Sequence, residues 1–435
     1  MKTNTKHNVA AETTHEGSPA RKITPMQELR RSVLSCMLWE GEFYENGVSI
    51  AQRIADLSKK VKPQEVEALA IEAREKMHLR HVPLYLMRAL AKDGKMTAKA
   101  LGKVIQRPDE IAEFLSLYWK DGKQPLAAQV KKGLGIAFNK FDEYSFAKYN
   151  RDATVKLRDA LFLCHPKPKD ALHQSIFDKI ANKTLRTPDT WEVGLSAGQD
   201  GKEVFERLMT EGNLGGMAFL RNLRKMQELK CDDGLIKSYF NVANFNRVLP
   251  YRFIAAARYK SNLEPELEKA MFKGIEKHGK LHGKTYLLID VSGSMEWALS
   301  DRSYMLRMDA ACALSMLVRE ICDDVEIHTF STSTVLVPPR RGFALRDAIV
   351  TSQRHGGTNL GQAVNKINEL KNAKDRLIVF TDEQSHDRVP GPNGLGYMIN
   401  VASYKNGVGY GPWTHIDGFS EAVIDWILEL ETLGF

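Results

Sequence analysis

The chain has 435 residues, 43% of them hydrophobic and 27% charged, and a formal net charge of +8. This composition excludes a largely disordered protein, and the length predicts two or three domains. The five cysteines are odd in number and form no CxxC pair, which argues against both a disulfide framework and a zinc site. No stretch approaches the roughly 18 apolar residues of a membrane helix, and no signal peptide is visible, so we predict a soluble, cytoplasmic, monomeric protein.

The charge is unevenly distributed along the sequence. Residues 1–280 carry a net charge of +13, whereas residues 281–435 carry −5. A basic body followed by an acidic segment favours contact between the first part and a polyanion such as a nucleic acid. Many basic proteins bind no polyanion, so charge alone leaves this question open.

The first part of the chain predicts helices throughout. Residues 1–24 are polar and lack periodicity, which predicts a flexible tail. From 25 to about 275, apolar residues recur every three or four positions, as in 64–78 and 81–92, with polar or Pro/Gly breaks between the segments. A long series of short helices is typical of stacked helix pairs of the HEAT type, although no clean sequence repeat is present.

The pattern changes after a Gly/Lys/His-rich linker at 276–284. Short apolar runs now alternate with helical segments, which indicates a doubly wound parallel sheet. The expected strands are 285–290, 325–331, 333–337, 376–382 and 397–403, and the expected helices are 301–321, one after Thr358, and 418–431. We therefore predict a multidomain α and α/β protein with a helical domain over 25–282 and an α/β domain over 283–435.

Hard oxygen donors follow the expected strands of the second domain. Asp290 ends the first of these strands, Ser292 and Ser294 lie in the next loop, Thr358 precedes a helix, and Asp382 ends a later strand. Ligands of doubly wound sheets bind at the carboxyl ends of the strands. Carboxylates and hydroxyls suit Mg²⁺ best, with Mn²⁺ or Ca²⁺ as alternatives, rather than zinc.

This order of residues resembles the metal-ion-dependent adhesion site of the von Willebrand factor A family, whose pattern is DxSxS, then Thr, then Asp. The resemblance implies that the serines and the threonine contact the metal directly and that the aspartates often act through water. It also implies metal-assisted protein binding rather than catalysis. The sequence contains no Walker A, GxSxG or HExxH motif, so we predict that the protein is not an enzyme.

Cations and aromatic residues are interleaved over residues 120–170. Cations attract phosphates, and exposed rings can stack on unpaired bases. The alternative is an amphipathic helix pair with the rings in the core and the lysines in water, and the sequence favours this alternative for the aromatic residues. Similarly, His165 in LCHPKP is either a phosphate or base donor or a helix-end histidine. A further basic face is predicted by the helical spacing of Arg221, Arg224 and Lys225.

Several segments resemble the TROVE module of the Ro autoantigen family: MLWEGEFY (37–44), LFLCHPKP (161–168), TPDTWEVGLSAG (187–198), GNLGGMAFLRNLRKM (212–226) and RVLPYRFIAAARYK (247–260). That family joins a ring of HEAT-like helical repeats to a terminal von Willebrand A domain. The resemblance therefore implies the same domain order as the residue patterns, over about 25–435.

The resemblance implies a noncatalytic, Ro-type RNA-binding protein that acts in RNA quality control or processing. Its implied partners are small noncoding Y-like RNA on the outer face of the ring, single-stranded 3′ ends of misfolded RNA in the hole, and a protein such as an exoribonuclease at the metal site. The motifs assign RNA contacts to Lys148, His165 and Arg151. General basic candidates are Lys131, Lys132, Lys156, Arg158, Lys167, Arg221 and Arg224. The alternative function is that of a metal-dependent protein-binding adaptor.

Overall fold

The computed structural model describes residues 13–34, 45–150, 153–246, 248–259, 261–273, 276, 279–420 and 422–432. These residues form two compact units. We call them the α/β unit, which takes residues within 1–50, 249–254 and 275–435, and the helical unit, which takes residues within 51–248 and 255–274. None of the helices described here is long and apolar enough to cross a membrane.

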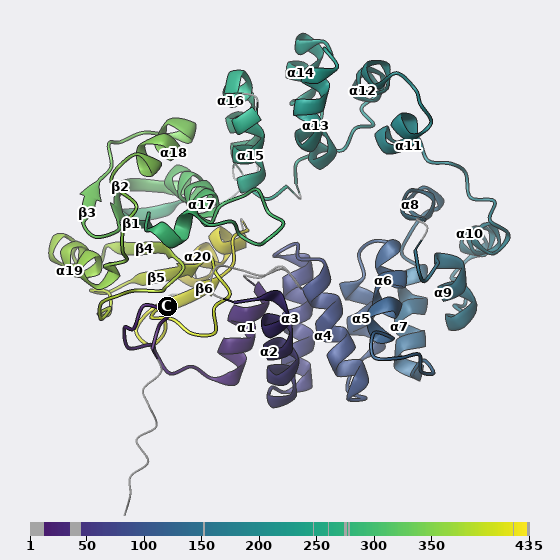
Figure 1. The fold of residues 1–435 in the computed structure, drawn as a ribbon, viewed down its shortest axis with the longest axis horizontal. Coiled ribbons are helices and arrows are strands. Elements are labelled where there is room, and N and C mark those ends of the chain that lie inside the picture. Colours follow the sequence, from purple (N-terminus) through teal and green to yellow (C-terminus); the bar gives the residue numbers. More distant parts are fainter. Residues whose placement is uncertain are drawn as a thin grey trace, which may run out of the picture. The chain divides into compact units, whose positions relative to one another are not determined.

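The chain before the sheet is built from short helices joined by turns (Figure 1). The first of these helices lies in the α/β unit, and most of the others form the helical unit. The described helices up to the sheet are α1 (Pro25–Leu34), α2 (Gly47–Lys60), α3 (Pro63–Glu75), α4 (His81–Lys92), α5 (Ala98–Val104), α6 (Asp109–Tyr118), α7 (Ala128–Phe138), α8 (Glu143–Tyr149), α9 (Leu157–Cys164), α10 (Ala171–Asn182), α11 (Trp191–Ser196), α12 (Gly201–Thr210), α13 (Gly216–Glu228), α14 (Asp233–Tyr239), α15 (Tyr251–Tyr259) and α16 (Glu264–Lys273). No strand occurs among the residues of this unit that the structure describes, so the prediction of an all-helical first part is confirmed.

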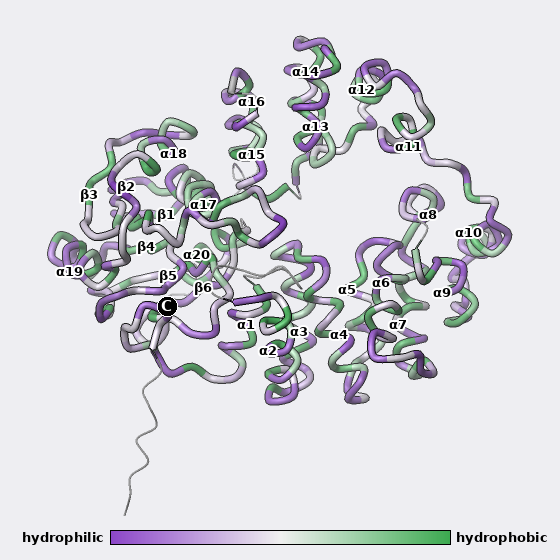
Figure 2. Tube along the Cα trace, in the orientation of Figure 1, coloured by the Kyte–Doolittle hydropathy of each residue, from purple (hydrophilic) through white to green (hydrophobic). Residues whose placement is uncertain are grey.

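Successive helices pack as neighbours. Helix α3 packs on α4 and α5, α5 on α7, α9 on α10, and α11 on α12. Apolar residues on one side of a helix are buried, as Val66, Leu69 and Ala73 are in α3. Figure 2 shows the resulting alternation of hydrophobic and hydrophilic segments along each helix. Local packing of this kind is the expected consequence of the three-and-four spacing.

The α/β unit contains a six-stranded sheet in the order β3-β2-β1-β4-β5-β6. Its elements are β1 (Leu281–Asp290), α17 (Arg307–Ile321), β2 (Cys322–Phe330), β3 (Thr334–Leu336), α18 (Gly342–Val350), α19 (Leu360–Leu370), β4 (Arg376–Thr381), β5 (Gly396–Asn400), β6 (Thr414–Asp417) and α20 (Ala422–Thr432). All neighbouring strands are parallel except β2 and β3. The mixed α/β fold predicted for the second part is confirmed.

Alternation along the strands divides the core between the two faces of the sheet. Tyr286 and Leu288 of β1 lie in one apolar cluster with Val364 and Ile367 of α19. Leu287 and Ile289 therefore face the other side, and α17 packs against β1. Because both faces are covered, the central strands are continuous apolar runs, which explains why the sequence revealed them so clearly.

Three elements differ from the sequence-based expectation. Strand β1 begins at Leu281, inside the segment expected to be a linker. Helix α18 and strand β6 were not predicted. Strand β6 is only four residues long, THID, and three of its side chains are polar, so it lacks the apolar run that identifies a buried strand.

Residues 13–24 also differ from the expected flexible tail, while residues 1–12 lie outside the described part. Thr14 and Ser18 are buried, and the backbone of Arg21 donates to Gly407 O at 3.1 Å. We call residues 13–34, including α1, the N-terminal strap. Its first half is held by polar contacts rather than by an apolar stripe, and a polar segment without periodicity gives no sequence sign of such docking.

Candidate metal centre and nucleic-acid interface

The five predicted metal ligands come together at the carboxyl edge of the sheet. Strands β1 and β4 are parallel neighbours, with Ile289 paired to Phe380, so Asp290 and Asp382 leave the sheet at the same edge. Ser292 Oγ lies 3.3 Å from Ser294 Oγ in the loop after β1. The backbone N–H of Gly293 donates to Gly356 O at 2.9 Å, which joins this loop to the one that carries Thr358.

Hydrogen bonds fix the orientation of Asp290. Its Oδ1 accepts from Ser292 N at 2.9 Å, and its Oδ2 accepts from the Thr381 hydroxyl at 2.6 Å. Asp290, Ser292 and Asp382 are completely buried, and Thr358 is nearly so. The site is therefore organised by its neighbours before any ion enters.

The two buried aspartates fit a cation. Burial, followed by the negative charge of Asp382, raises the pKa of Asp290 well above its usual range. The guanidinium of Arg307, also completely buried, lies 3.3 Å from Asp382 Oδ2 and supplies one fixed positive charge. A divalent ion would supply the remaining charge and use the hydroxyls of Ser292, Ser294 and Thr358 as oxygen ligands. No group of three or more His, Cys, Asp and Glu suited to a metal occurs among the described residues, so hydroxyl ligation is essential to this candidate site.

A pocket of about 680 Å³ lies within the helical unit. Its volume is within the range of about 300–1,000 Å³ that is typical of ligand sites. The lining residues come from α8, from the starts of α11 and α13, and from the loops around them: Arg107, Tyr144, Lys148, Tyr149, Thr190, Trp191, Glu192, Leu208, Asn213, Leu214, Gly215, Gly216, Met217, Ala218, Arg221, Asn244, Asn246 and Val248. Three cations, three large rings and three asparagines thus share one cavity with a single carboxylate.

Two predicted RNA-binding residues line this pocket, Lys148 and Arg221. The Nζ of Lys148 lies 5.8 Å from the ring centroids of both Tyr144 and Tyr149. Arg107 lies 4.4 Å from the centroid of Tyr149, a contact that the sequence did not indicate. No periodic pattern identifies Arg107, because it lies in the turn before α6.

The aromatic residues of 138–149 divide into two groups. Phe138 and Phe146 are completely buried and stack at 5.9 Å, as the core alternative predicted. Tyr144 is 49% exposed, and both Tyr144 and Tyr149 line the pocket. The expectation that the rings belong to the core is therefore correct for these phenylalanines and wrong for these tyrosines.

The close approach of two pocket segments requires a glycine. A Cβ on Gly216, at the start of α13, would lie 2.3 Å from Asn244 O. This contact explains the third glycine of the GNLGGM segment, because any side chain would push the 244–246 loop away from α13.

The remaining basic candidates lie elsewhere on the helical unit and are exposed. Lys131 and Lys132 lie on α7, and Lys156, Arg158, His165 and Lys167 lie on α9 or immediately beside it. His165 ends α9 with a left-handed backbone (φ +46°), so its helix-end position is confirmed. Arg224 is on α13 and pairs with Glu228 at 3.3 Å. Arg151 lies outside the described residues.

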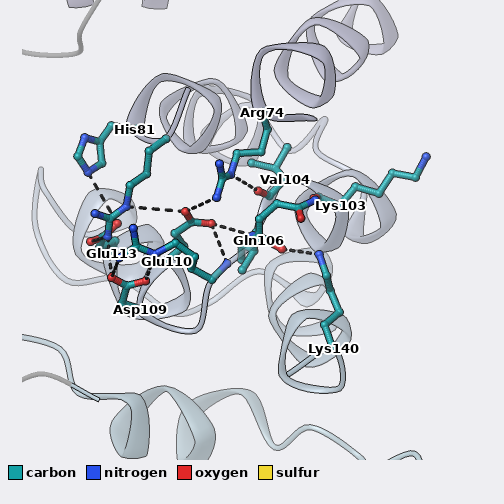
Figure 3. A network of polar contacts seen from close by, with 12 residues as sticks. Arg74, His81, Lys103, Val104, Gln106, Asp109, Glu110, Glu113 and Lys140 are labelled. Carbon is teal, nitrogen blue, oxygen red and sulfur yellow. Dashed lines mark hydrogen bonds and ion pairs between the residues drawn. The ribbon is translucent and has the colours of Figure 1, made fainter. Parts of the chain in front are cut away.

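A buried ion-pair network holds the turn that carries Arg107 (Figure 3). Glu110 accepts from Arg74 at 2.6 Å and from the backbone of Gln106 at 2.7 Å. Asp109 accepts from both Arg107 and Arg80. Burial raises the pKa of Glu110, although Arg74 acts in the opposite direction. The network thus joins α3, α6 and the turn between α5 and α6 to one wall of the pocket.

Two family models match the sequence. The one described as the TROVE domain covers residues 183–278, and the one described as the Ro60 vWA domain covers residues 284–392. The chain therefore carries a TROVE domain and a Ro60-type von Willebrand A domain. The resemblance predicted from the motifs is therefore confirmed.

The match to the TROVE domain includes α11 and α13, with Trp191 and Arg221 of the pocket. The match to the Ro60 vWA domain includes all five candidate metal ligands. Among solved structures, the chain is similar to the RO (RSR) protein of Deinococcus radiodurans, with 15% identity and a TM-score of 0.59 over 91% of this chain and 97% of that chain. At this identity the likeness shows a shared fold. No curated protein matches the sequence.

The network predicts a large loss of stability for Glu110→Ala. Removing one partner of a buried ion pair leaves Arg74 uncompensated, which costs about 3–5 kcal/mol. Urea titration followed by circular dichroism should show this loss. Glu113→Ala is the matched control, because Glu113 is one-third exposed, and it should cost less than about 1 kcal/mol. Equal losses for the two variants would contradict the assigned role of Glu110.

The Ro60-type vWA domain predicts a metal-dependent effect of Arg307→Met. The variant lacks the positive charge that Arg307 places beside Asp382, so the repulsion between Asp290 and Asp382 is less compensated. The melting temperature in EDTA should therefore fall strongly. Mn²⁺ should restore most of the loss and bind more tightly than to the unaltered protein, because it no longer shares the site with the positive charge of Arg307. Thermal melts in EDTA and in Mn²⁺ measure the effect. An identical decrease in both conditions would contradict it.

Proposed function

We propose that this TROVE-domain protein is a noncatalytic RNA-binding protein of the Ro ribonucleoprotein type. The observation that carries the proposal is the pocket of the helical unit, in which cations, aromatic rings and amides converge. Family membership supports RNA binding in general. The finer parts of the proposal are the kind of RNA and the residues that contact it.

The pocket suits unpaired nucleotides. Lys148, Arg221 and Arg107 can neutralise phosphates, while Tyr144, Tyr149 and Trp191 offer rings for stacking. Asn213, Asn244 and Asn246 add amide groups that donate and accept hydrogen bonds, as base edges require. A duplex presents no free base faces, so we assign this pocket to a single-stranded end, such as the 3′ end of a misfolded RNA.

The exposed cations around α7 and α9 suit structured RNA. The side chains are all exposed and can follow a phosphate backbone: Lys131, Lys132, Lys156, Arg158, His165 and Lys167. Lys131 lies near Cys164, at the end of α9, so the two helices contribute to one surface. We assign this surface to a small Y-like noncoding RNA. In this proposal Lys148, which the motif resemblance groups with His165, belongs to the pocket instead.

The two assignments predict opposite selectivity in two double variants. Lys148→Ala combined with Arg221→Ala should weaken the binding of an unstructured oligoribonucleotide more than the binding of a blunt RNA hairpin. Lys131→Ala with Lys132→Ala should do the reverse. Each lost phosphate contact should reduce the salt slope of log K by about 0.7–0.9. Fluorescence anisotropy at several salt concentrations measures both effects.

Lys60→Ala, an exposed lysine of α2, is the matched control and should change neither slope. Equal weakening of both RNAs by both double variants would contradict the division of labour. Salt-independent affinity of the unaltered protein would contradict RNA binding through phosphates altogether.

A second candidate function is metal-dependent docking of a protein at the vWA domain. The loop after Ser294 exposes two large rings, Trp297 at 55% and Tyr304 at 86%. Aromatic residues often dominate binding energy at protein interfaces. We propose that Mg²⁺, held by Asp290, Ser292, Ser294, Thr358 and Asp382, accepts a carboxylate from a protein partner, such as an exoribonuclease, while these rings contact its surface.

This second function predicts that Asp290→Ala and EDTA remove the same partners in a pull-down from the source lysate. The aspartate variant loses metal affinity, so both treatments leave the surface without an ion. Glu369→Ala, an exposed change on α19, is the control and should keep all partners. Retention of every partner by Asp290→Ala would contradict the proposal.

A further inference from the structure

The N-terminal strap grips the loop that follows β4. The hydroxyl of Thr14 donates to Ser385 O at 2.9 Å, and the backbone of His15 donates to Gln384 Oε1 at 2.8 Å. The hydroxyl of Ser18 donates to Asp387 O at 2.6 Å. This loop, residues 382–387, begins with the metal-ligand candidate Asp382. These three hydrogen bonds hold Gln384, Ser385 and Asp387, three of the five residues that follow this aspartate.

Gln384 links the strap to Asp382 itself. Its backbone N–H donates to Asp382 Oδ1 at 3.3 Å, and its side-chain amide donates to Asp382 O at 3.2 Å. The amide oxygen of the same side chain accepts from His15. The side chain of Gln384 thus hydrogen-bonds both to the strap backbone and to the backbone carbonyl of Asp382.

A second route leads to Thr358. The backbone N–H of Thr358 donates to His386 Nδ1 at 2.9 Å, and His386 Nε2 lies 2.9 Å from Glu16 Oε2. Ser385 donates its hydroxyl to Thr358 O at 3.2 Å and accepts from Thr14 through its carbonyl. Both backbone polar groups of Thr358 thus bond to a loop residue that itself contacts the strap. His386 accepts from the N–H group, and Ser385 donates to the carbonyl.

A third contact fixes the start of the loop. Arg31 of α1 pairs with Glu383 at 3.0 Å, and both side chains are completely buried. Burial alone would raise the pKa of Glu383, but Arg31 and then His415 outweigh it and lower this pKa to about 2. Glu383 has a left-handed backbone (φ +63°), a strained conformation for a residue with a side chain. A Cβ on Gly407 would lie 2.2 Å from Glu383 Oε2, so a glycine at this position leaves room for the ion pair of Arg31 and Glu383.

We propose that the strap is a positioning element of the metal site, which acts through the 382–387 loop on Asp382 and Thr358. The proposal rests on the metal site proposed above. The hydroxyl of Thr358 and the carboxylate of Asp382 must lie at fixed positions to bind an ion, and the strap restrains the segments that carry them. Outer-shell partners of this kind typically change metal affinity about 10–100-fold when they are removed.

The direct test is Mn²⁺ binding to the full chain with Thr14→Val and Glu16→Gln combined. The double variant removes the Thr14 hydroxyl and the Glu16 charge, the two strap contacts on the route to Thr358, and leaves the five candidate ligands intact. The concentration of free Mn²⁺, followed by electron paramagnetic resonance, should show affinity weakened about tenfold. Arg21→Ala is the matched control, because Arg21 contacts Val389 O, beyond the loop, and it should bind Mn²⁺ normally.

A purely structural role of the strap would give a different result. The double variant would then melt at a lower temperature in EDTA, while the folded protein at low temperature would bind Mn²⁺ as the unaltered chain does. Unchanged affinity would overturn the proposal. If the unaltered chain itself bound no Mn²⁺, or if Asp290→Ala bound it normally, the metal site would fall and the strap proposal with it.

The unaltered chain offers an independent test. If docking of the strap raises the affinity of the site for an ion, thermodynamic linkage requires that the bound ion favours the docked strap by the same factor. The amides of residues 13–24 should therefore exchange hydrogen about tenfold more slowly in Mn²⁺ than in EDTA, to match the loss of affinity in the double variant. Exchange that is unaffected by Mn²⁺ in a protein that binds it would overturn the coupling.

Discussion

Four carboxylates are buried at the carboxyl edge of the sheet: Asp290, Asp382, Glu383 and Asp417. Each charge costs several kcal/mol to remove from water unless a partner compensates it. The compensating guanidiniums come from outside the sheet, Arg307 from the start of α17 and Arg31 from α1. This need for charge balance accounts for the position of both elements. It also explains why a polar N-terminal segment docks on this unit rather than remaining in solvent.

The helical unit follows a comparable rule on a smaller scale. Its pocket is lined by cations and rings. Such side chains keep fixed positions only where buried partners hold them. Arg107 is held by Asp109, which belongs to the same ion-pair cluster as Glu110. Lys140 adds hydrogen bonds to the carbonyls of Gly102 and Ile105, at the end of α5. Arg107 thus links one wall of the pocket to the ion pairs that fix α3 and α6.

The sequence predicted the elements whose patterns are local. The apolar strands and the helical segments 64–78 and 81–92 follow from periodicity, and the five candidate metal ligands were proposed from their position at strand ends. That Phe146 is buried and Tyr144 is exposed could not be predicted. Both occur within one short helix, and only the packing decides which of them faces the core. Arg107 and β6 were missed because neither lies in an apolar periodic pattern. The strap was missed because its first half is held by polar contacts with residues distant in sequence.

The charges at the sheet edge lead to one remaining requirement. Arg307 lies against Asp382, and Arg31 together with His415 lies against Glu383. The hydrogen bonds of Asp290, by contrast, come from neutral groups, the Ser292 amide and the Thr381 hydroxyl. These bonds orient the carboxylate but do not balance its charge. A divalent ion beside Ser292, Ser294 and Thr358 would do so, and the excess positive charge it brings would suit a carboxylate from another protein. The electrostatics of the buried edge therefore favour both an ion and a negatively charged group of a partner at the same place.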